Sequence, residues 1–254
     1  GFDIVATGHY ASTTNIDGFN YLTRAKDTNK DQTYFLCQVN KEAIQKTMFP
    51  LGNLIKPQVR KYALDLNLKS VATKKDSTGN CFIGERDFRK LLTNYLTSKV
   101  VGEHIGVLYY TIGQRKGLNI DHAAGPWFVV GKDVKKNILF VCHQTKKEWL
   151  YSTSCIVKDV NWILPQDYNI PEKCTAKFRY RQPDQDVYLK YIDSKTVILS
   201  YPQKIASVTC GQEAVFYDGN ICMGGGVIEQ VFIDDVDLNE KILMTYKEKL
   251  NGKH

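Results

Sequence analysis

The stretch "EAVFYDGNICMGGGVIEQVF", residues 213–232, places two apolar runs on either side of an Asp-Gly-Asn turn. This arrangement is the signature of a β-hairpin. Four short apolar runs precede it at regular spacing, "CIVKDVNWI", "CTAKFRYRQ", "DVYLKYID" and "TVILSY", and "PWFVVGKDVKKNILFVC" adds a further hairpin pattern. Because so many short strands follow one another with glycine-marked turns in a small unit, the sequence favours an antiparallel β-barrel over a β-sandwich for residues 126–232.

Outside the barrel, the apolar spacing predicts helices. "PQVRKYALDLNL" (57–68) and "DFRKLLTNYL" (87–96) both carry apolar residues at i, i+3, i+4 and i+7. Asn40 is a good N-cap for a helix in "NKEAIQKTMF", and "NEKILMTYKEKL" has a helical pattern in the tail. "DQTYFLCQV" (31–39) is instead rich in aromatic and β-favouring residues, which predicts a strand-like or irregular segment.

The first residues read as part of a parallel sheet. "FDIVATGHYA", residues 2–11, predicts a buried strand at Ile4–Ala6 that runs into a turn at Gly8. All-apolar strands of this kind usually lie inside parallel sheets, whose neighbouring strands would have to precede this one. We therefore expect the chain to start inside a larger α/β domain. An open sheet edge at residues 1–10 also predicts poor solubility.

The composition is that of a globular protein with a mild excess of cations. The chain has 254 residues, 24% of them charged, and a net charge of +7, which fits a polyanionic partner such as nucleic acid but is also common in other soluble proteins. It has no run of 18 apolar residues and no secretory leader, so we expect a cytoplasmic protein without a membrane partner.

The cysteines argue against structural cross-links. There are seven, an odd number, and no CxxC pair occurs, which argues against a disulfide framework and a zinc ribbon. We expect no bound metal. Four cysteines sit in apolar, strand-like runs and are expected to be buried and inert: Cys142, Cys155, Cys174 and Cys222.

Two early polar stretches suit ligand binding. "TGHY" (7–10) follows the predicted strand, where a glycine lets the backbone approach a ligand and a histidine projects at the sheet edge. A tight turn with a surface histidine explains this stretch more simply. "NKDQTYF" (29–35) combines a lysine for phosphate, a glutamine for a base edge and aromatic rings for stacking. A solvated turn before a core strand explains that composition equally well.

A third stretch, "KFRYRQPD", alternates cations with aromatic rings. A strand with a period of two would place Lys177, Arg179 and Arg181 on one face, and Phe178 and Tyr180 on the other. Such a cationic stripe suits an anion, and in particular nucleic acid. The solvent side of a barrel strand is the alternative.

Cys81 stands apart from the other cysteines. It lies in the polar, glycine-containing loop "KKDSTGNCFIGER" (74–86), between lysines on one side and Arg86 on the other. Nearby cations favour the thiolate, which is the reactive form of cysteine. The loop therefore suits a nucleophile, although a lone cysteine without a recognised partner is more often inert.

Together these segments resemble one family, the tRNA-specific 2-thiouridylases of bacteria and organelles, and the bacterial members most. The matching segments fall in order and cover residues 1 to about 230: "FDIVATGHYA", "KDQTYFL", "FPLGNLIKPQVRKYA", "KKDSTGNCFIGERDFRKLLTNYL", "YYTIGQRKGL", "PWFVVGKD", "AKFRYRQPD" and "GQEAVFYDGNICMGGGVIE". The resemblance implies an α/β multidomain fold. It consists of a remnant of a doubly wound ATP-pyrophosphatase (adenine nucleotide hydrolase-like) domain at 1–48, with 69–84 returning to it, a small central domain at 49–125 that includes the cysteine loop, the antiparallel β-barrel at 126–232 and a tail at 233–254.

The resemblance also implies a reaction. Family members transfer sulfur to C2 of the wobble uridine of tRNA, using ATP with Mg²⁺ and an adenylated base. Cys81 matches the cysteine that carries the persulfide, charged by a sulfur-relay donor protein, and Gly8 matches a position that contacts ATP. Positions that contact the anticodon arm of tRNA are matched by His9, Lys30, Asp31, Gln32, Arg179, Tyr180 and Gln212.

The sequence departs from the family pattern in two places that matter for activity. It contains no SGGxDS-like pyrophosphate loop, and the partner cysteine that precedes "FDIVATGHY" in the family is absent. We therefore expect this chain to be inactive alone. One alternative is a non-catalytic RNA-binding remnant, which would bind tRNA in a salt-dependent way without turnover. Another is a different ATP-pyrophosphatase, such as an amidotransferase, which would lack the cysteine loop followed by the barrel motifs.

Overall fold

The computed structural model describes residues 3–68, 90–94, 99–118, 120 and 125–251. Two compact units are formed: unit 1 contains Gly1–Cys81, Val157–Leu199 and Gln212–Val227, and unit 2 contains Phe82–Ile156, Ser200–Gly211 and Ile228–His254. Among the helices of the described residues, none combines the length and the hydropathy that a membrane span needs.

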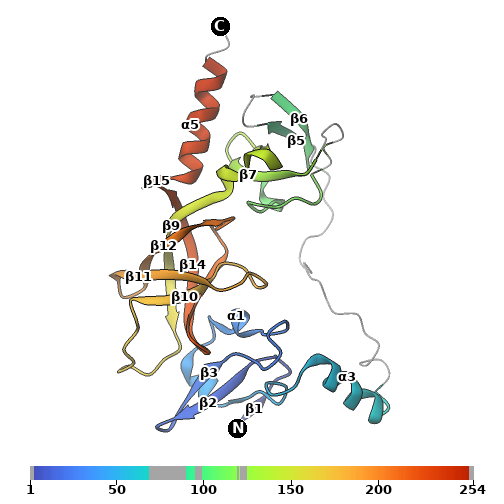
Figure 1. Ribbon diagram of the computed structural model, residues 1–254, viewed down its shortest axis with the longest axis vertical. Coiled ribbons are helices and arrows are strands. Elements are labelled where there is room, and N and C mark those ends of the chain that lie inside the picture. Colours follow the sequence, from blue (N-terminus) through green and yellow to red (C-terminus); the bar gives the residue numbers. More distant parts are fainter. Residues whose placement is uncertain (1–2, 69–89, 95–98, 119, 121–124, 252–254) are drawn as a thin grey trace. The chain divides into compact units, whose positions relative to one another are not determined.

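The predicted antiparallel barrel is confirmed. The larger sheet has the strand order β13-β10-β11-β12-β9-β14-β3-β2, and β13 also pairs with β14. This second pairing closes the six strands from β13 to β14 into a ring, and Figure 1 shows these strands in yellow to red. The ring consists of β9 (Tyr151–Trp162), β10 (Lys173–Lys177), β11 (Gln185–Asp193), β12 (Thr196–Ala206), β13 (Glu213–Asp218) and β14 (Ile221–Ile233).

An N-terminal hairpin extends this sheet. β2 (Ser12–Ile16) and β3 (Phe19–Thr23) pair antiparallel, and β3 meets β14 at the pair Thr23 and Ile221. Asp17 and Gly18 turn the hairpin with φ values of 51° and 83°. Positive φ at both positions is typical of the tight Asp-Gly turn, whose twist matches that of the strands.

The strand predicted at Ile4–Ala6 forms, but its predicted burial is wrong. β1 (Val5–Ala6) pairs in parallel with β4 (Thr47–Met48), and among the described residues it pairs with no other strand. Ile4 and Val5 are both 59% exposed. A parallel strand is buried only when helices and further strands cover it, and these two strands supply no such cover.

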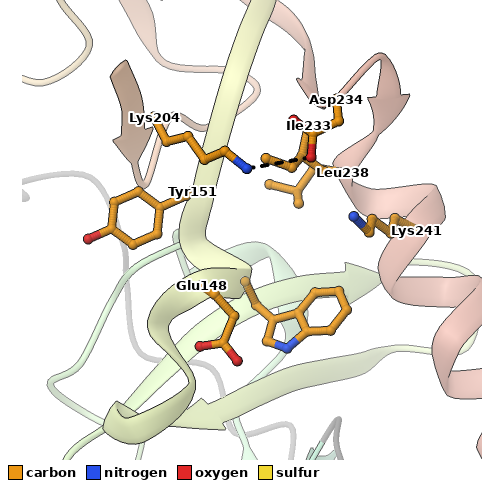
Figure 2. Close-up of a pocket in the computed structure, with 8 residues that line it drawn as sticks. Glu148, Tyr151, Lys204, Ile233, Asp234, Leu238 and Lys241 are labelled. Atoms are coloured by element: carbon orange, nitrogen blue, oxygen red, sulfur yellow. Dashed lines mark hydrogen bonds and ion pairs between the residues drawn. The ribbon is translucent and has the colours of Figure 1, made fainter.

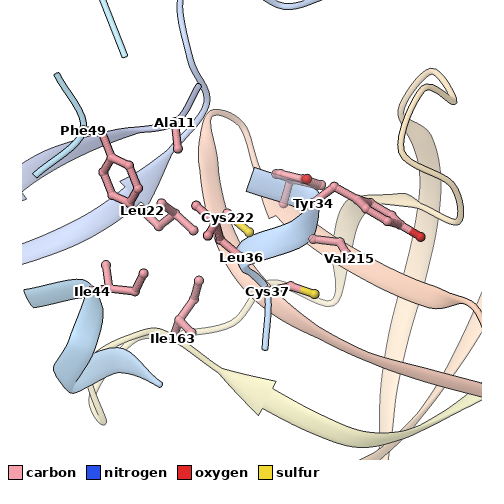
Figure 3. Close-up of a cluster of buried hydrophobic side chains, with 11 residues drawn as sticks. Ala11, Leu22, Tyr34, Leu36, Cys37, Ile44, Phe49, Ile163, Val215 and Cys222 are labelled. Carbon is pink, nitrogen blue, oxygen red and sulfur yellow. The ribbon is translucent and has the colours of Figure 1, made fainter. Parts of the chain in front are cut away.

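The core of unit 1 joins the N-terminal segment to the barrel. α1 (Thr33–Leu36) is a short helix, so the prediction of a strand-like segment at 31–39 is wrong. Figure 3 shows Leu36 and Cys37 packed with Ile44, Val215 and Cys222. A Cβ on Gly225 would lie 2.7 Å from the Ala214 carbonyl oxygen and 3.1 Å from the Cys37 side chain. Glycine in β14 therefore lets the end of α1 approach the barrel closely.

The other helices near the N-terminus match their predicted positions. α2 (Lys41–Gln45) is capped by Asn40, whose side chain accepts a hydrogen bond from the Ala43 N–H at 2.8 Å. α3 (Lys56–Asp65) begins with a proline in its first turn. Its apolar residues do not form a covered face, because Tyr62 is 53% exposed and only Ala63 is buried.

Unit 2 contains a separate four-stranded sheet, β6-β5-β8-β7. The predicted hairpin at 126–142 is confirmed as β7 (Trp127–Asp133) and β8 (Ile138–His143), and it pairs with β5 rather than with the ring. The helix predicted at 87–96 is wrong over β5 (Lys90–Asn94), whose backbone pairs with β6 (Lys99–His104) and β8. Strand pairing on both sides overrides the helical spacing of the sequence.

The remaining elements of unit 2 are short, apart from the last helix. They are η1 (Val107–Tyr109), η2 (Gln144–Leu150) and β15 (Val236–Asp237), which pairs with β14. The helical pattern of the tail is confirmed by α5 (Leu238–Asn251). The loop that carries Cys81 lies outside the described residues.

Candidate nucleic-acid interface

Asp31 is a buried carboxylate held by two hydrogen bonds and an ion pair. It is 5% exposed, and its oxygens accept hydrogen bonds from the Ala25 N–H at 3.0 Å and the Thr33 hydroxyl at 2.7 Å. The Arg24 guanidinium lies 3.9 Å from the same carboxylate and 3.6 Å from the centre of the Tyr217 ring. A buried carboxylate bonded in this way fixes the loop around it. Asp31 therefore holds the segment in place, and its burial leaves little of it for a ligand to touch.

Arg24 links this segment to the loop after β10. Its guanidinium lies 2.8 Å from one oxygen of Asp184, and the Lys177 ammonium lies 3.7 Å from the other. The sequence analysis missed Arg24, because "YLTRAKD" marks it only as a cation after a strand. Its partners lie far away along the chain, and no local pattern connects them.

Gln32 joins the same segment to the irregular stretch that carries Gly8 and His9. Its side-chain oxygen accepts a hydrogen bond from the Tyr10 N–H at 2.8 Å, and its own N–H donates to the Tyr10 carbonyl at 2.7 Å. His9 is half-buried, with its Nδ1 2.8 Å from the Thr7 hydroxyl. Gly8 is exposed, and a Cβ there would meet no atom within 4 Å. The backbone at Gly8 therefore has open space beside it.

The prediction of one cationic strand face at 177–181 is wrong. β10 ends at Lys177, and the chain then turns, with the Gln182 N–H donating to the Arg179 carbonyl at 3.1 Å. The period of two therefore stops before Arg179. The turn buries Phe178 and brings the Tyr180 hydroxyl within 3.4 Å of the Lys30 carbonyl, to which it donates.

Gln212 and Arg179 lie beside α1. Gln212 immediately precedes Glu213, whose carbonyl accepts a hydrogen bond from the Tyr34 hydroxyl at 2.9 Å. Gln38 donates to the Glu213 carboxylate at 3.2 Å. Arg179 is half-buried, and this burial lowers the pKa of its guanidinium, while the nearby Tyr34 opposes the shift.

The structure thus brings the described candidate residues together around α1 in unit 1. They come from four segments that are distant in sequence, and they are Gly8, His9, Lys30, Asp31, Gln32, Arg179, Tyr180 and Gln212. Cys81 lies outside the described residues, so its prediction as a sulfur carrier stays a prediction.

The buried cysteines behave as predicted. Cys142, Cys155, Cys174 and Cys222 are buried, and burial raises the pKa of each thiol to about 12. Burial also raises the pKa of Cys37. These thiols stay protonated at neutral pH and are poor nucleophiles.

Unit 2 contains a cavity that is formed by other segments than those that carry the candidate site residues. Its volume is about 230 Å³, and Trp149 is one of its lining residues. Figure 2 shows Tyr151, Leu238 and two lysines at its wall. The Lys204 ammonium lies 3.5 Å from the Asp234 carboxylate, and both side chains are more than half exposed. An exposed ion pair of this kind contributes little to stability. None of the predicted site residues lines the cavity.

Three family models match the chain in succession. The tRNA methyl transferase HUP domain matches residues 1–85, the tRNA methyl transferase PRC-barrel domain matches 85–143, and the aminomethyltransferase beta-barrel domain matches 152–228. The protein named tRNA-specific 2-thiouridylase MnmA from Mycoplasma mycoides subsp. mycoides SC is 50% identical over 250 residues, and that from Mycoplasma capricolum is 50% identical over 246. The chain belongs to the tRNA-specific 2-thiouridylase family.

Other 2-thiouridylases of the family show the same extent of similarity. The MnmA protein of Bacillus cytotoxicus is 48% identical over 242 residues, which cover 91% of this chain. Each of these three matches covers 65% of the relative, so the chain spans about two thirds of the length of the 2-thiouridylases it matches. The predicted family and fold class are confirmed, with a HUP domain, a central PRC-barrel domain and a C-terminal β-barrel.

Proposed function

We propose that this chain is part of an enzyme that transfers sulfur to C2 of the wobble uridine in tRNA. The supporting observation is the gathering of the assigned residues around α1, where Lys30, Arg179 and Arg181 lie in the segments that meet there. The relatives that carry the name 2-thiouridylase support the same reaction. Cations beside aromatic rings suit an RNA backbone and unpaired bases.

The proposal divides the assigned residues into two groups. Asp31 and Gln32 are positioning residues, because their side chains bond within the protein. Lys30, His9 and Tyr180 are half-buried at the surface of the same cluster, where we assign them contact with tRNA together with Arg179 and Gln212.

Gly8 fits a nucleotide-binding position. When bound, ATP with Mg²⁺ would supply the adenylyl group that turns the C2 oxygen of the uridine into a leaving group. A Cβ on Gly8 would meet no atom within 4 Å, so the open space at this position admits a ligand close to the backbone. Gly8 would then bind and orient one side of that ligand.

We assign the sulfur step to Cys81. The terminal sulfur of a Cys81 persulfide, charged by a sulfur-relay donor protein, bonds to C2 as AMP leaves. A second thiol then attacks the Cys81 sulfur, which leaves the transferred sulfur on the base and forms a disulfide. Two electrons from a thiol reductant restore the two thiols.

The test is thiolation of tRNA by the complete protein that contains this chain. Cys81→Ser removes the sulfur carrier and is expected to abolish 2-thiouridine formation, measured by nucleoside mass spectrometry. Cys210→Ser is the matched control, because Cys210 is an exposed cysteine that is assigned no part in the reaction. Wild-type rates in Cys81→Ser would refute the assignment.

A second candidate is RNA binding without catalysis. It is favoured by the net charge of +7 together with the exposed aromatic and cationic residues near α1. It predicts that the 254-residue chain binds tRNA with an affinity that falls steeply with salt. Thiolation by the complete protein that depends on Cys81 would contradict this candidate.

A further inference from the structure

Phe35 is an exposed aromatic residue on a firmly anchored helix. It is 54% exposed, whereas its neighbours Thr33, Tyr34 and Leu36 in α1 are buried. The Thr33 hydroxyl donates to Asp31, and the Tyr34 hydroxyl donates to the Glu213 carbonyl. These bonds fix the direction in which Phe35 points. Phe35 therefore stays accessible to a ligand on a backbone that is held in place.

Tyr180 supports the Phe35 ring from a distant part of the chain. The two ring centres lie 4.5 Å apart with an angle of 41° between the planes, within the range of favourable aromatic pairs. The Tyr180 hydroxyl donates to the Lys30 carbonyl at 3.4 Å, and Tyr34 lies edge-on to Phe35 at 5.6 Å. Phe35 and Tyr180 form a pre-arranged pair of rings, here called the aromatic platform.

Cations lie beside the aromatic platform and in the segments that carry it. Arg181 is exposed, and its guanidinium lies 5.9 Å from the centre of the Tyr180 ring. Lys30 and Arg179 are half-buried in the two segments that carry the platform. The nearby carboxylate of Asp184 is bridged by Arg24 and Lys177, which offsets its charge. An aromatic surface edged by cations is complementary to a nucleobase that is joined to a phosphate.

We propose that the aromatic platform stacks one unpaired nucleobase of the RNA ligand, and that Arg181 binds the phosphate next to that base. This inference rests on the proposed function, since it takes tRNA as the ligand. It adds Phe35 and Arg181 to the assigned residues and gives Tyr180 a defined role. Stacking is independent of base identity, because every base has an aromatic face.

The test measures binding of an anticodon stem-loop to the 254-residue chain by fluorescence anisotropy. Phe35→Ala is expected to weaken binding about 30-fold, the middle of the range seen when one stacked base loses its partner. Phe35→Leu keeps an apolar side chain without a ring and is expected to weaken binding by the same factor. Phe35→Tyr keeps the ring and is expected to stay within about twofold of the wild type.

A second readout separates stacking from charge. Phe35→Ala should leave the slope of log affinity against log salt unchanged, whereas Arg181→Ala should reduce the slope by about one. Tyr62→Ala is the matched control, because Tyr62 is 53% exposed on α3, and it should bind like the wild type. Binding to a fully paired RNA duplex should not respond to Phe35→Ala, since a duplex offers no unpaired base.

The outcomes distinguish this inference from the proposed function. If the wild type binds the stem-loop but Phe35→Ala and Phe35→Leu bind equally well, the stacking proposal is wrong and tRNA binding stands. An equal loss in Tyr62→Ala also overturns it. If neither the wild-type chain nor the complete protein that contains it binds the stem-loop or intact tRNA, the proposed function itself fails. Far-ultraviolet circular dichroism of each variant checks that the fold is kept.

Discussion

Two regions of unit 1 look similar in sequence and differ in structure. The α1 region, from Asp31 to Cys37, rests on the barrel with its polar groups bonded and most of its apolar side chains buried. The β1–β4 sheet exposes Ile4, Val5 and Met48, each at least half. Both stretches are apolar and β-favouring in sequence. The difference shows that burial depends on the partners that a segment finds, and that stability within one unit is uneven.

Replacing Asp31 should destabilise the α1 region more than any of the substitutions described below. Asp31→Ala leaves the buried donors of Thr33 and Ala25 without their acceptor and Arg24 without one of its two carboxylates. We expect a loss of about 3 kcal/mol in the free energy of unfolding, measured by urea denaturation. Asp184→Ala removes the more exposed partner of Arg24 and should cost less than about 1 kcal/mol. Equal losses of stability in the two variants would mean that the deeper burial of Asp31 does not make its contribution larger than that of Asp184.

Filling the space at Gly225 should loosen the contact between α1 and the barrel. The new Cβ of Gly225→Ala would press on the Ala214 carbonyl and the Cys37 side chain, and we expect a loss of about 2 kcal/mol. Gly8→Ala is the control, because its Cβ would meet no atom within 4 Å. Its free energy of unfolding should stay within about 0.5 kcal/mol of the wild type in the same urea titration.

High pH should weaken the α1 region through its thiols. Burial raises the pKa of Cys222 from 9.0 to about 12 and raises that of Cys37 as well. A group whose pKa is raised by folding stabilises the protein fully below its unfolded pKa, and this contribution is lost as the pH rises. The free energy of unfolding should therefore be level below about pH 8 and fall above pH 9, by about 1 kcal/mol per buried thiol at pH 10. A level profile to pH 11 would show that these thiols ionise equally in both states.

Changing the β1–β4 sheet should have the smallest effect on stability. Val5 is 59% exposed, so Val5→Lys should change the free energy of unfolding by less than about 0.5 kcal/mol. It should also reduce aggregation, since a charge on an exposed strand blocks pairing with another chain. Light scattering at increasing concentration measures this effect. A large loss of stability in Val5→Lys would remove the contrast between the two regions.

The sequence predicted the barrel well because its strands follow local rules. Runs such as Thr196–Tyr201 and the Asp-Gly-Asn turn carry their own signals, and the strands form where these predict. The α1 helix did not follow from its sequence, because it is four residues long and is held by bonds to Asp31 and Glu213. The bond to Glu213 joins residues 179 positions apart, and a local sequence pattern does not contain it.

The candidate site shows the same limit. The resemblance to the family identified Lys30, Tyr180 and Gln212 as candidate site residues. It did not show which of the candidate side chains form hydrogen bonds within the protein. Asp31 and Gln32 look like surface residues in "NKDQTYF", yet both are tied into the fold. Arg24 was missed because its role appears only when the loop after β10 reaches it. The role of a polar residue depends on the residues that it contacts in the folded protein, and the sequence alone did not identify these contacts.

The pairing of β3 with β14 has a consequence for the order in which the protein is made. Thr23 and Ile221 are about 200 residues apart, so the ribosome makes the N-terminal hairpin and α1 long before their partner strand exists. At about 5–20 residues per second, that interval lasts roughly 10–40 s. During this time the apolar side chains of α1 have no barrel to cover them. The segment that presents Phe35 thus leaves the ribosome well before β14 and can reach its place only after that strand has been made.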